Sequence, residues 1–334
     1  MNGDCCIVVT TINAPTQAML ELAKGASDHD AHFIVIGDSK SPKDFRLPGS
    51  TYLDVEAQRA TPFGYAALCP TRHYARKNIG YLLAATRNAQ VIVETDDDNI
   101  PVEGFWTPRS RSCEAAEVRD AGWCNVYRYF SDTNIWPRGL PLNELARPAA
   151  SLSPVSSFEC PIQQGLADLN PDVDAIYRLV LPLPVSFQKR QPIALAPGVW
   201  CPFNSQNTTF FREAFPLLYL PYHCSFRMTD IWRSFIAQRL GWEAGWRVMF
   251  HNSTVYQERN EHDLMRDFAE EIPGYLNNER IRKSLEDADF RSGVDALWDN
   301  LLKAYELLIG LEVVGAEESQ LVSAWVEDMT KATS

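Results

Sequence analysis

Short apolar runs and stretches of helical period alternate along the first hundred residues of the chain. Three runs rich in β-branched residues are typical of strands, at residues 6–12, 32–37 and 91–94, and a further short strand is predicted at 51–54. Two stretches between them carry apolar residues at helical spacing, at residues 15–24 and 76–88. Strands that alternate with helices predict an α/β fold with a mainly parallel sheet and right-handed crossovers. Ligands of such sheets bind beyond the carboxyl ends of the strands.

The pattern changes after residue 100. Residues 101–202 are rich in proline, tryptophan and serine and show weak periodicity, which predicts irregular loops and short strands. Strands are predicted again over 204–211 and 247–251. An amphipathic helix is predicted over 231–240, with Asp230 as its N-cap, because aspartate is favoured at that position.

The last part of the sequence has the strongest helical character. From residue 261 the chain is predicted to be almost wholly helical, with breaks at 273–274 and at 289–292. We therefore expect a main α/β domain over residues 1–260 and a helical extension over residues 261–334.

Composition narrows the class of protein. The 334 residues are 46% hydrophobic and 22% charged, as in an ordinary globular protein. The formal charge of −12 makes the chain a poor candidate for nucleic-acid binding, which relies on basic surfaces. The eight cysteines include no CxxC pair, which disfavours zinc and redox sites. No stretch has the character of a signal peptide or a transmembrane segment, so we expect a cytoplasmic protein; peripheral membrane association stays open.

Three adjacent carboxylates, Asp96, Asp97 and Asp98, follow the strand predicted over 91–94. Their mutual repulsion at the end of an apolar strand would be relieved by a divalent cation, and oxygen ligands suit Mg²⁺ or Mn²⁺. The alternative is a solvated acidic turn that caps the next segment. The position at the end of a parallel strand favours metal binding.

Basic residues gather at the start of the helix predicted over 76–88. The run from Arg72 to Asn78 includes Arg76 and Lys77, and the first turn of a helix favours anions. A diphosphate would be held by such a cluster, although a solvated basic helix start is the commoner outcome. His251, at the end of a predicted strand, is either a metal ligand or a surface histidine, and its spacing alone does not decide between them.

An ordered set of motifs lies along roughly residues 5 to 280, at 9–16, 35–38, 74–82, 94–99, 171–179, 202–208, 229–234, 250–253 and 261–275. These motifs resemble those of the STELLO-like glycosyltransferases. They are also similar, more distantly, to those of the plant reversibly glycosylated polypeptides, which act as UDP-arabinopyranose mutases.

The resemblance implies a GT-A type fold, with a nucleotide-binding half over about residues 1–100 and an acceptor-side half over about 101–260. An Asp-x-Asp motif binds the metal and the donor diphosphate in that fold, so Asp96 and Asp98 inherit these roles with Asp97 between them. The resemblance also implies that His251 is a third metal ligand and that Asp230 is the base that takes the acceptor proton. It places Thr10, Thr11 and Asp38 at the nucleoside. Lys77 falls at the diphosphate and Asn207 in the sugar pocket.

The leading functional hypothesis is Mn²⁺- or Mg²⁺-dependent transfer of a sugar, with inversion, from a nucleotide sugar to a glycan, lipid or protein acceptor. A second hypothesis is a mutase or self-glycosylating protein, in which Arg190 lies close to the sugar-carrying arginine of the reversibly glycosylated polypeptides. A third hypothesis is an inactive scaffolding module. The presence of carboxylates at positions 96, 97, 98 and 230 argues against it. STELLO proteins carry a membrane anchor that this sequence does not show, which leaves the compartment and the acceptor open.

Overall fold

The computed structural model describes residues 4–258 and 263–334. Its first strands lie side by side in the order β3-β2-β1-β4, and all of them are parallel. These strands are β1 (Cys5–Thr11), β2 (His32–Gly37), β3 (Thr51–Leu53) and β4 (Val91–Thr95). The α/β fold with parallel strands that the sequence predicts for this part of the chain is confirmed.

The same sheet continues past β4 in the order β12-β9-β13-β10-β6-β8, with β5 paired to β13. β12 is antiparallel to both β4 and β9, so the sheet becomes mixed beyond the parallel strands. The additional strands of this sheet are β5 (Asn99–Pro101), β6 (Ser112–Val118), β8 (Ser156–Glu159), β9 (Ile162–Asp168), β10 (Ile193–Leu195), β12 (Asn207–Phe211) and β13 (Val248–Gln257). β7 (Gly122–Trp123) and β11 (Val199–Trp200) pair with each other in a separate small sheet. The proline-rich segment 101–202 therefore supplies strands to the central sheet.

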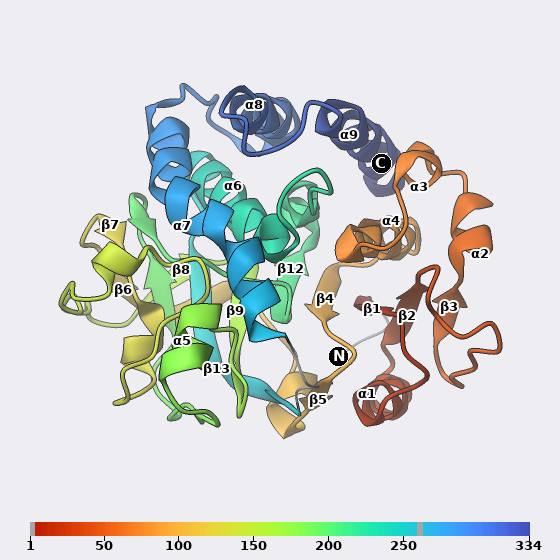
Figure 1. Ribbon diagram of the computed structural model, residues 1–334, viewed down its shortest axis with the longest axis horizontal. Coiled ribbons are helices and arrows are strands. Elements are labelled where there is room, and N and C mark those ends of the chain that lie inside the picture. Colours follow the sequence, from red (N-terminus) through yellow and green to blue (C-terminus); the bar gives the residue numbers. More distant parts are fainter. Residues whose placement is uncertain (1–3, 259–262) are drawn as a thin grey trace.

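Helices cover both faces of the parallel strands, with α1 on one face and α4 on the other (Figure 1). The helices are α1 (Gln17–Asp28), α2 (Val55–Arg59), α3 (Gly64–Leu68), α4 (Lys77–Thr86), α5 (Ala175–Val180), α6 (Thr229–Glu243), α7 (Leu264–Asp287), α8 (Leu297–Gly310) and α9 (Glu318–Thr333). Gly80 lets α4 approach the sheet closely, because a Cβ at this position would lie 2.5 Å from Cγ1 of Val8. Most predicted elements are present, but β13 extends six residues past the predicted end at 251.

The C-terminal helices are part of the main core. Tyr65 of α3 donates its backbone N–H to Asp328 of α9 at 2.8 Å, and the buried Glu318 accepts from the Tyr219 hydroxyl. One hydrophobic cluster runs from Cys6 in β1 to Met329 in α9. The predicted extension over 261–334 therefore packs as an integral layer. The predicted boundary at 260/261 lies outside the described residues.

One of the two predicted helix breaks is present in the structure. α7 runs through Pro273 without interruption, so the break expected at 273–274 is wrong. The break expected at 289–292 is present, because α7 ends at Asp287 and α8 begins at Leu297. Among the described helices, none is long and apolar enough to cross a membrane.

Candidate functional site

The carboxyl ends of β1 and β4 meet at the point where the chain order of the sheet reverses. β2 and β3 lie on one side of β1, whereas β4 lies on its other side. The Thr11 hydroxyl donates to Oδ2 of Asp97 at 2.5 Å, and Nδ2 of Asn13 donates to the same oxygen at 3.0 Å. This junction is the place where open α/β sheets bind ligands.

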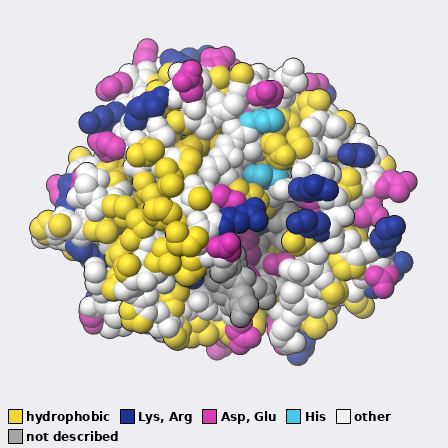
Figure 2. Space-filling view, in the orientation of Figure 1, with side chains coloured by type: hydrophobic (Ala, Val, Ile, Leu, Met, Phe, Trp, Pro, Cys, Tyr) yellow, Lys and Arg dark blue, Asp and Glu magenta, His cyan; other side chains and the backbone are white. Residues whose placement is uncertain are grey.

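A cavity of about 500 Å³ opens at this junction. Its size suits a nucleotide-sized ligand. Acidic and basic side chains gather together at the centre of this face of the molecule (Figure 2). Of the predicted site residues, those that line the cavity are Thr10, Thr11, Asp38, Arg76, Asp96, Asp97, Asp98 and Asp230.

The three carboxylates of the acidic motif lie in this cavity with different partners. Oδ1 of Asp96 pairs with Nζ of Lys77 at 2.9 Å, and Oδ2 of Asp98 accepts from Nε2 of Gln257 at 2.9 Å. Desolvation raises the pKa of Asp96 to about 7, with help from the charges of Asp98 and Asp97 and against the attraction of Lys77. A divalent cation would relieve this accumulated negative charge.

The described side chains provide few ligands for a metal ion. Within the described ranges, no group of three histidine, cysteine, aspartate or glutamate side chains could hold a metal ion. Mg²⁺ and Mn²⁺ are commonly bound by one or two carboxylates together with substrate phosphates and water. Asp96 and Asp98 fit that arrangement as hard oxygen donors in a cavity that also admits a ligand.

Lys77 and Asn78 do not line the cavity, contrary to the roles predicted for them. Lys77 is fully buried, and its Nζ donates to the backbone oxygen of Thr95 at 2.9 Å as well as to Asp96. Its position orients Asp96 and leaves no exposed ammonium for a diphosphate. Asn78 forms two hydrogen bonds with the backbone of Leu220, so its role is structural. Both residues face the core because α4 presents this side to the sheet.

Arg76 is the buried cation of the predicted cluster that lines the cavity. Its Nε donates to Oε1 of Gln58 at 2.7 Å, and its Nη1 donates to the backbone oxygen of Cys69 at 2.8 Å. Across the described part of the chain, no carboxylate contacts this guanidinium, and its buried Nη2 has no hydrogen-bond partner. A buried cation without a counter-charge is costly, which favours an anionic ligand at this position.

The cavity wall near β2 combines Asp38 with aromatic side chains. Oδ2 of Asp38 accepts the backbone N–H of His73 at 3.0 Å. Burial, reinforced by His223, lowers the pKa of His73 to about 4, so its ring is neutral at pH 7. The His73 ring stacks on Tyr74 and meets Phe226 edge-on, and all three rings line the cavity. Such a wall can hold a planar base by stacking and by hydrogen bonds.

Asn207, which the resemblance assigns to the sugar pocket, is not among the residues that line the cavity. Its Nδ2 donates to the backbone oxygen of Leu166 at 2.9 Å and to the Thr254 hydroxyl at 2.8 Å. The preceding residue, Gln206, lines the cavity. Alternate residues of a strand face opposite sides, so an error of one position reverses the assignment.

His251 is also outside the cavity, which argues against a role as metal ligand beside Asp96 and Asp98. Its Nδ1 lies 3.0 Å from the backbone oxygen of Asn252, and burial, followed by the charge of Arg109, lowers its pKa to about 4. Gln257, six residues further along β13, is the residue that reaches Asp98. At about 3.3 Å per residue, these positions are on the order of 20 Å apart along the strand.

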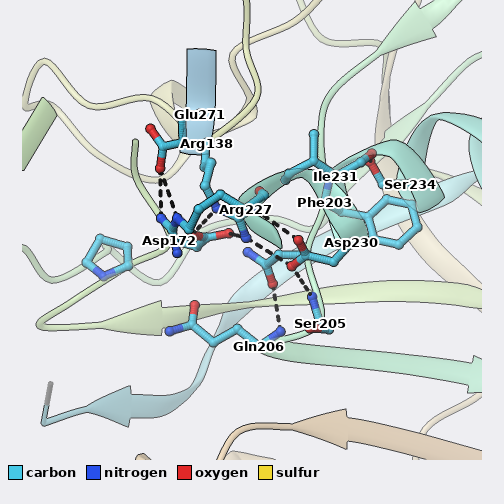
Figure 3. Close-up of polar contacts among 12 residues, drawn as sticks. Arg138, Asp172, Phe203, Ser205, Gln206, Arg227, Asp230, Ile231, Ser234 and Glu271 are labelled. Atoms are coloured by element: carbon cyan, nitrogen blue, oxygen red, sulfur yellow. Dashed lines mark hydrogen bonds and ion pairs between the residues drawn. The ribbon is translucent and has the colours of Figure 1, made fainter. Parts of the chain in front are cut away.

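Asp230 lies at the start of α6 beside Arg138 and Ser205 (Figure 3), and four described donors contact its carboxylate. Oδ1 accepts from Nη1 of Arg138 at 3.0 Å and from the Tyr74 hydroxyl at 3.1 Å. Oδ2 accepts from Nη2 of Arg138 at 2.9 Å and from the backbone N–H of Ser205 at 3.1 Å. The N-cap position of α6 is Met228, so the capping role predicted for Asp230 is wrong.

These contacts also argue against Asp230 as the base. Burial opposes its ionisation, but the charge and hydrogen bonds of Arg138, with the charge of Arg233, outweigh burial and hold its pKa well below the ordinary value. A general base works best with a pKa near the operating pH, and it needs a lone pair that faces its substrate. An ionised carboxylate has about four acceptor positions, and four donors already occupy those of Asp230.

Asp172 and Arg138 are cavity residues that the sequence analysis did not select. Nε and Nη2 of Arg138 donate to the two carboxylate oxygens of Asp172, each at 2.8 Å. Asp172 lies in the motif at 171–179, which carried part of the resemblance. Asp174 in the same motif caps α5 instead, because its side chain accepts from the backbone N–H of Tyr177 at 2.7 Å. No pattern in the sequence distinguishes Arg138 from other arginines.

Arg190, the residue of the self-glycosylation hypothesis, is not among the residues that line the cavity. Its Nη2 pairs with Oδ1 of Asp132 at 2.7 Å, and its Nε donates to Gln188 at 3.0 Å. The described contacts therefore give the self-glycosylation hypothesis no support.

The parallel strands, the junction of β1 with β4 and the acidic cavity define an α/β protein with a ligand site at the carboxyl ends of its strands. The sequence model of the STELLO glycosyltransferases matches residues 227–333. Two proteins of Arabidopsis thaliana, "Probable glycosyltransferase STELLO2" and "Probable glycosyltransferase STELLO1", are each 28% identical to 97% of this chain. These matches confirm the resemblance to STELLO glycosyltransferases. The chain spans 44% of the length of each of these two relatives.

Proposed function

We propose that the chain is a metal-dependent glycosyltransferase that moves a sugar, with inversion, from a nucleotide sugar to a hydroxyl group of a glycan, lipid or protein. The observation that carries the proposal is the cavity in which Asp96, Asp97 and Asp98 meet the end of β1. Its volume of about 500 Å³ and its mixture of carboxylates, cations and aromatic rings suit a charged nucleotide sugar. The names of the matched family and relatives support the same reaction class.

The nucleoside would bind against the ends of β1 and β2. Thr10 and Thr11 provide hydroxyl groups there, and Asp38 provides a carboxylate. Arg76 would contact the diphosphate, since its buried guanidinium has no carboxylate partner in the described ranges. A charge-assisted hydrogen bond of this kind contributes about 1.5–3 kcal/mol.

Asp96 and Asp98 are the residues that would hold Mn²⁺ or Mg²⁺. Such an ion, when bound, neutralises negative charge on the leaving diphosphate. Lys77 keeps Asp96 oriented from beneath the cavity, through its 2.9 Å ion pair. Gln257 does the same for Asp98, through a 2.9 Å hydrogen bond.

Isothermal calorimetry with a panel of nucleoside diphosphates tests the proposal. At least one nucleoside diphosphate should bind about tenfold or more tightly in Mn²⁺ than in EDTA, a difference of roughly 1.4 kcal/mol. Asp98→Asn should remove this dependence, whereas Asp44→Asn, at an exposed position outside the cavity, should keep it. Equal affinities in Mn²⁺ and in EDTA for every nucleotide would overturn metal dependence, and no binding at all would overturn the donor class.

A further inference from the structure

Arg138 lies between two carboxylates that share its single positive charge (Figure 3). Its Nη2 is 2.8 Å from Oδ2 of Asp172 and 2.9 Å from Oδ2 of Asp230. The side chains of all three residues are at most 10% exposed, so the group holds one excess negative charge in a buried region. Arg227 does not compensate this charge, because it pairs with Glu271 at 2.9 Å. Excess charge in a buried site is costly, and the uptake of one proton removes it.

The two carboxylates differ in their capacity to accept that proton. Four donors surround Asp230, from Arg138, Tyr74 and Ser205. Among the described residues, the carboxylate of Asp172 receives one hydrogen bond on each oxygen, both from Arg138. Each oxygen of a carboxylate offers about two acceptor positions, so the described contacts leave one position open on each oxygen of Asp172. Asp172 also lines the cavity, which gives a substrate hydroxyl access to it.

The geometry points to Asp172, rather than Asp230, as the general base of the proposed transfer, and this inference rests on the proposed function. The acceptor hydroxyl gives its proton to a carboxylate oxygen of Asp172 as its oxygen forms a bond to the anomeric carbon. The bond between that carbon and the diphosphate oxygen breaks, and its electron pair leaves with the nucleoside diphosphate. Arg138 and Asp230 are positioning residues, because their ion pair fixes the guanidinium that orients Asp172.

A comparison of two nucleophiles tests this assignment. The donor is the nucleotide sugar that the parent chain consumes, selected from a panel of uridine and guanosine diphosphate sugars with Mn²⁺. Water or an alcohol must lose a proton during transfer, whereas azide attacks the anomeric carbon as an anion and needs no base. Asp172→Asn should lose about 10²–10⁴-fold in transfer to water or alcohol. Its azide-driven release of nucleoside diphosphate should stay within tenfold of the parent.

Two further variants separate chemistry from folding. Asp172→Glu keeps a negative charge beside Arg138, so it should keep the parent's melting temperature and still lose more than tenfold in transfer to alcohol. Asp174→Asn disturbs the same turn at a residue outside the cavity, and should retain both reactions. Assays are run below the melting temperature of each variant.

The assignment is wrong if Asp172→Asn loses both reactions by the same factor, which would indicate a structural role. It is equally wrong if this variant keeps alcohol transfer within a few-fold of the parent, or if Asp230→Asn alone shows the selective loss. A parent chain that consumes no donor with either nucleophile would overturn the proposed function, and the assignment with it.

Discussion

Asp230→Asn should destabilise the protein, although asparagine has the same shape as aspartate. Each oxygen of Asp230 accepts from one nitrogen of Arg138, at 3.0 and 2.9 Å. Asparagine has only one acceptor oxygen, so in either orientation its amide N–H₂ group faces a donor of Arg138. The substitution therefore breaks a buried ion pair and leaves part of the guanidinium unsatisfied.

The cost follows from the burial of the pair, whose side chains are 5% and 6% exposed. Asp172 still pairs with Arg138 in the variant, so the cost is that of a buried donor left unsatisfied, about 1–3 kcal/mol. An unfolding entropy of about 2.1 cal/mol/K per residue gives roughly 0.7 kcal/mol per degree for 334 residues. The melting temperature of Asp230→Asn should therefore fall by about 1.5–4 °C.

The loss should also depend on pH in a definite direction. The pKa of Asp230 lies well below its ordinary value of 3.8, because Arg138 and Arg233 favour the ionised form more than burial opposes it. The stabilisation is therefore present above pH 4 and is lost as the pH falls through the folded-state pKa. The difference in melting temperature between parent and variant should be constant from about pH 5 to 8 and shrink below pH 4.

Differential scanning calorimetry of Asp230→Asn and Asp97→Asn measures both effects. Asp97 is a matched control in the same cavity, since its described hydrogen bonds come from uncharged groups of Thr11 and Asn13. Its melting temperature should change by less than about 1 °C, because both hydrogen bonds reach one oxygen of Asp97 and the amide oxygen of asparagine can accept them both. The reasoning fails if Asp230→Asn melts within 1 °C of the parent at pH 7, or if its loss is unchanged at pH 3.

Two further predictions concern Arg76 and Lys77. Arg76→Gln should weaken the binding of a nucleoside diphosphate by about tenfold or more and that of the nucleoside by less than twofold, because the lost contact is to phosphate; equal weakening in calorimetry would contradict the assignment. Lys77→Met should destabilise the fold more at pH 8 than at pH 6. Loss of the ammonium raises the pKa of Asp96 above about 7, so the ionisation of Asp96 at pH 8 costs the folded variant more than the folded parent. Thermal melts at both pH values check this, and a loss that does not change with pH would refute the coupling.

The alternation of apolar runs with helical stretches was enough to predict the parallel strands and the acidic end of β4. β-branched residues fill β1, β2 and β4 because these strands are buried on both faces. The position of Asp96 directly after β4 then follows from chain connectivity, because residues beyond a parallel strand emerge at its carboxyl end. Local pattern and connectivity therefore determined the fold class and the acidic side of the site.

Which of two neighbouring residues faces the cavity was decided by tertiary packing. Arg76 lines the cavity while Lys77 is buried beneath it, and Gln206 lines it while Asn207 does not. One residue of rotation in a helix, or one of register in a strand, separates these outcomes. The sequence carries no local signal that fixes such a small displacement.

The cluster of Arg138, Asp172 and Asp230 depended most fully on the tertiary structure. Its members are 34 and 58 positions apart along the chain, as 172 follows 138 and 230 follows 172. A single arginine or aspartate has no periodicity, and its charge partner is set only when distant segments pack together. The sequence determined that a carboxylate occupies position 230, whereas the approach of Arg138 decided that this carboxylate stays ionised and fully engaged. The low dielectric and the enclosed geometry around Asp230 exist only in the folded chain. For this reason its sequence position favours a general base, whereas its folded surroundings favour a fixed counter-charge to Arg138.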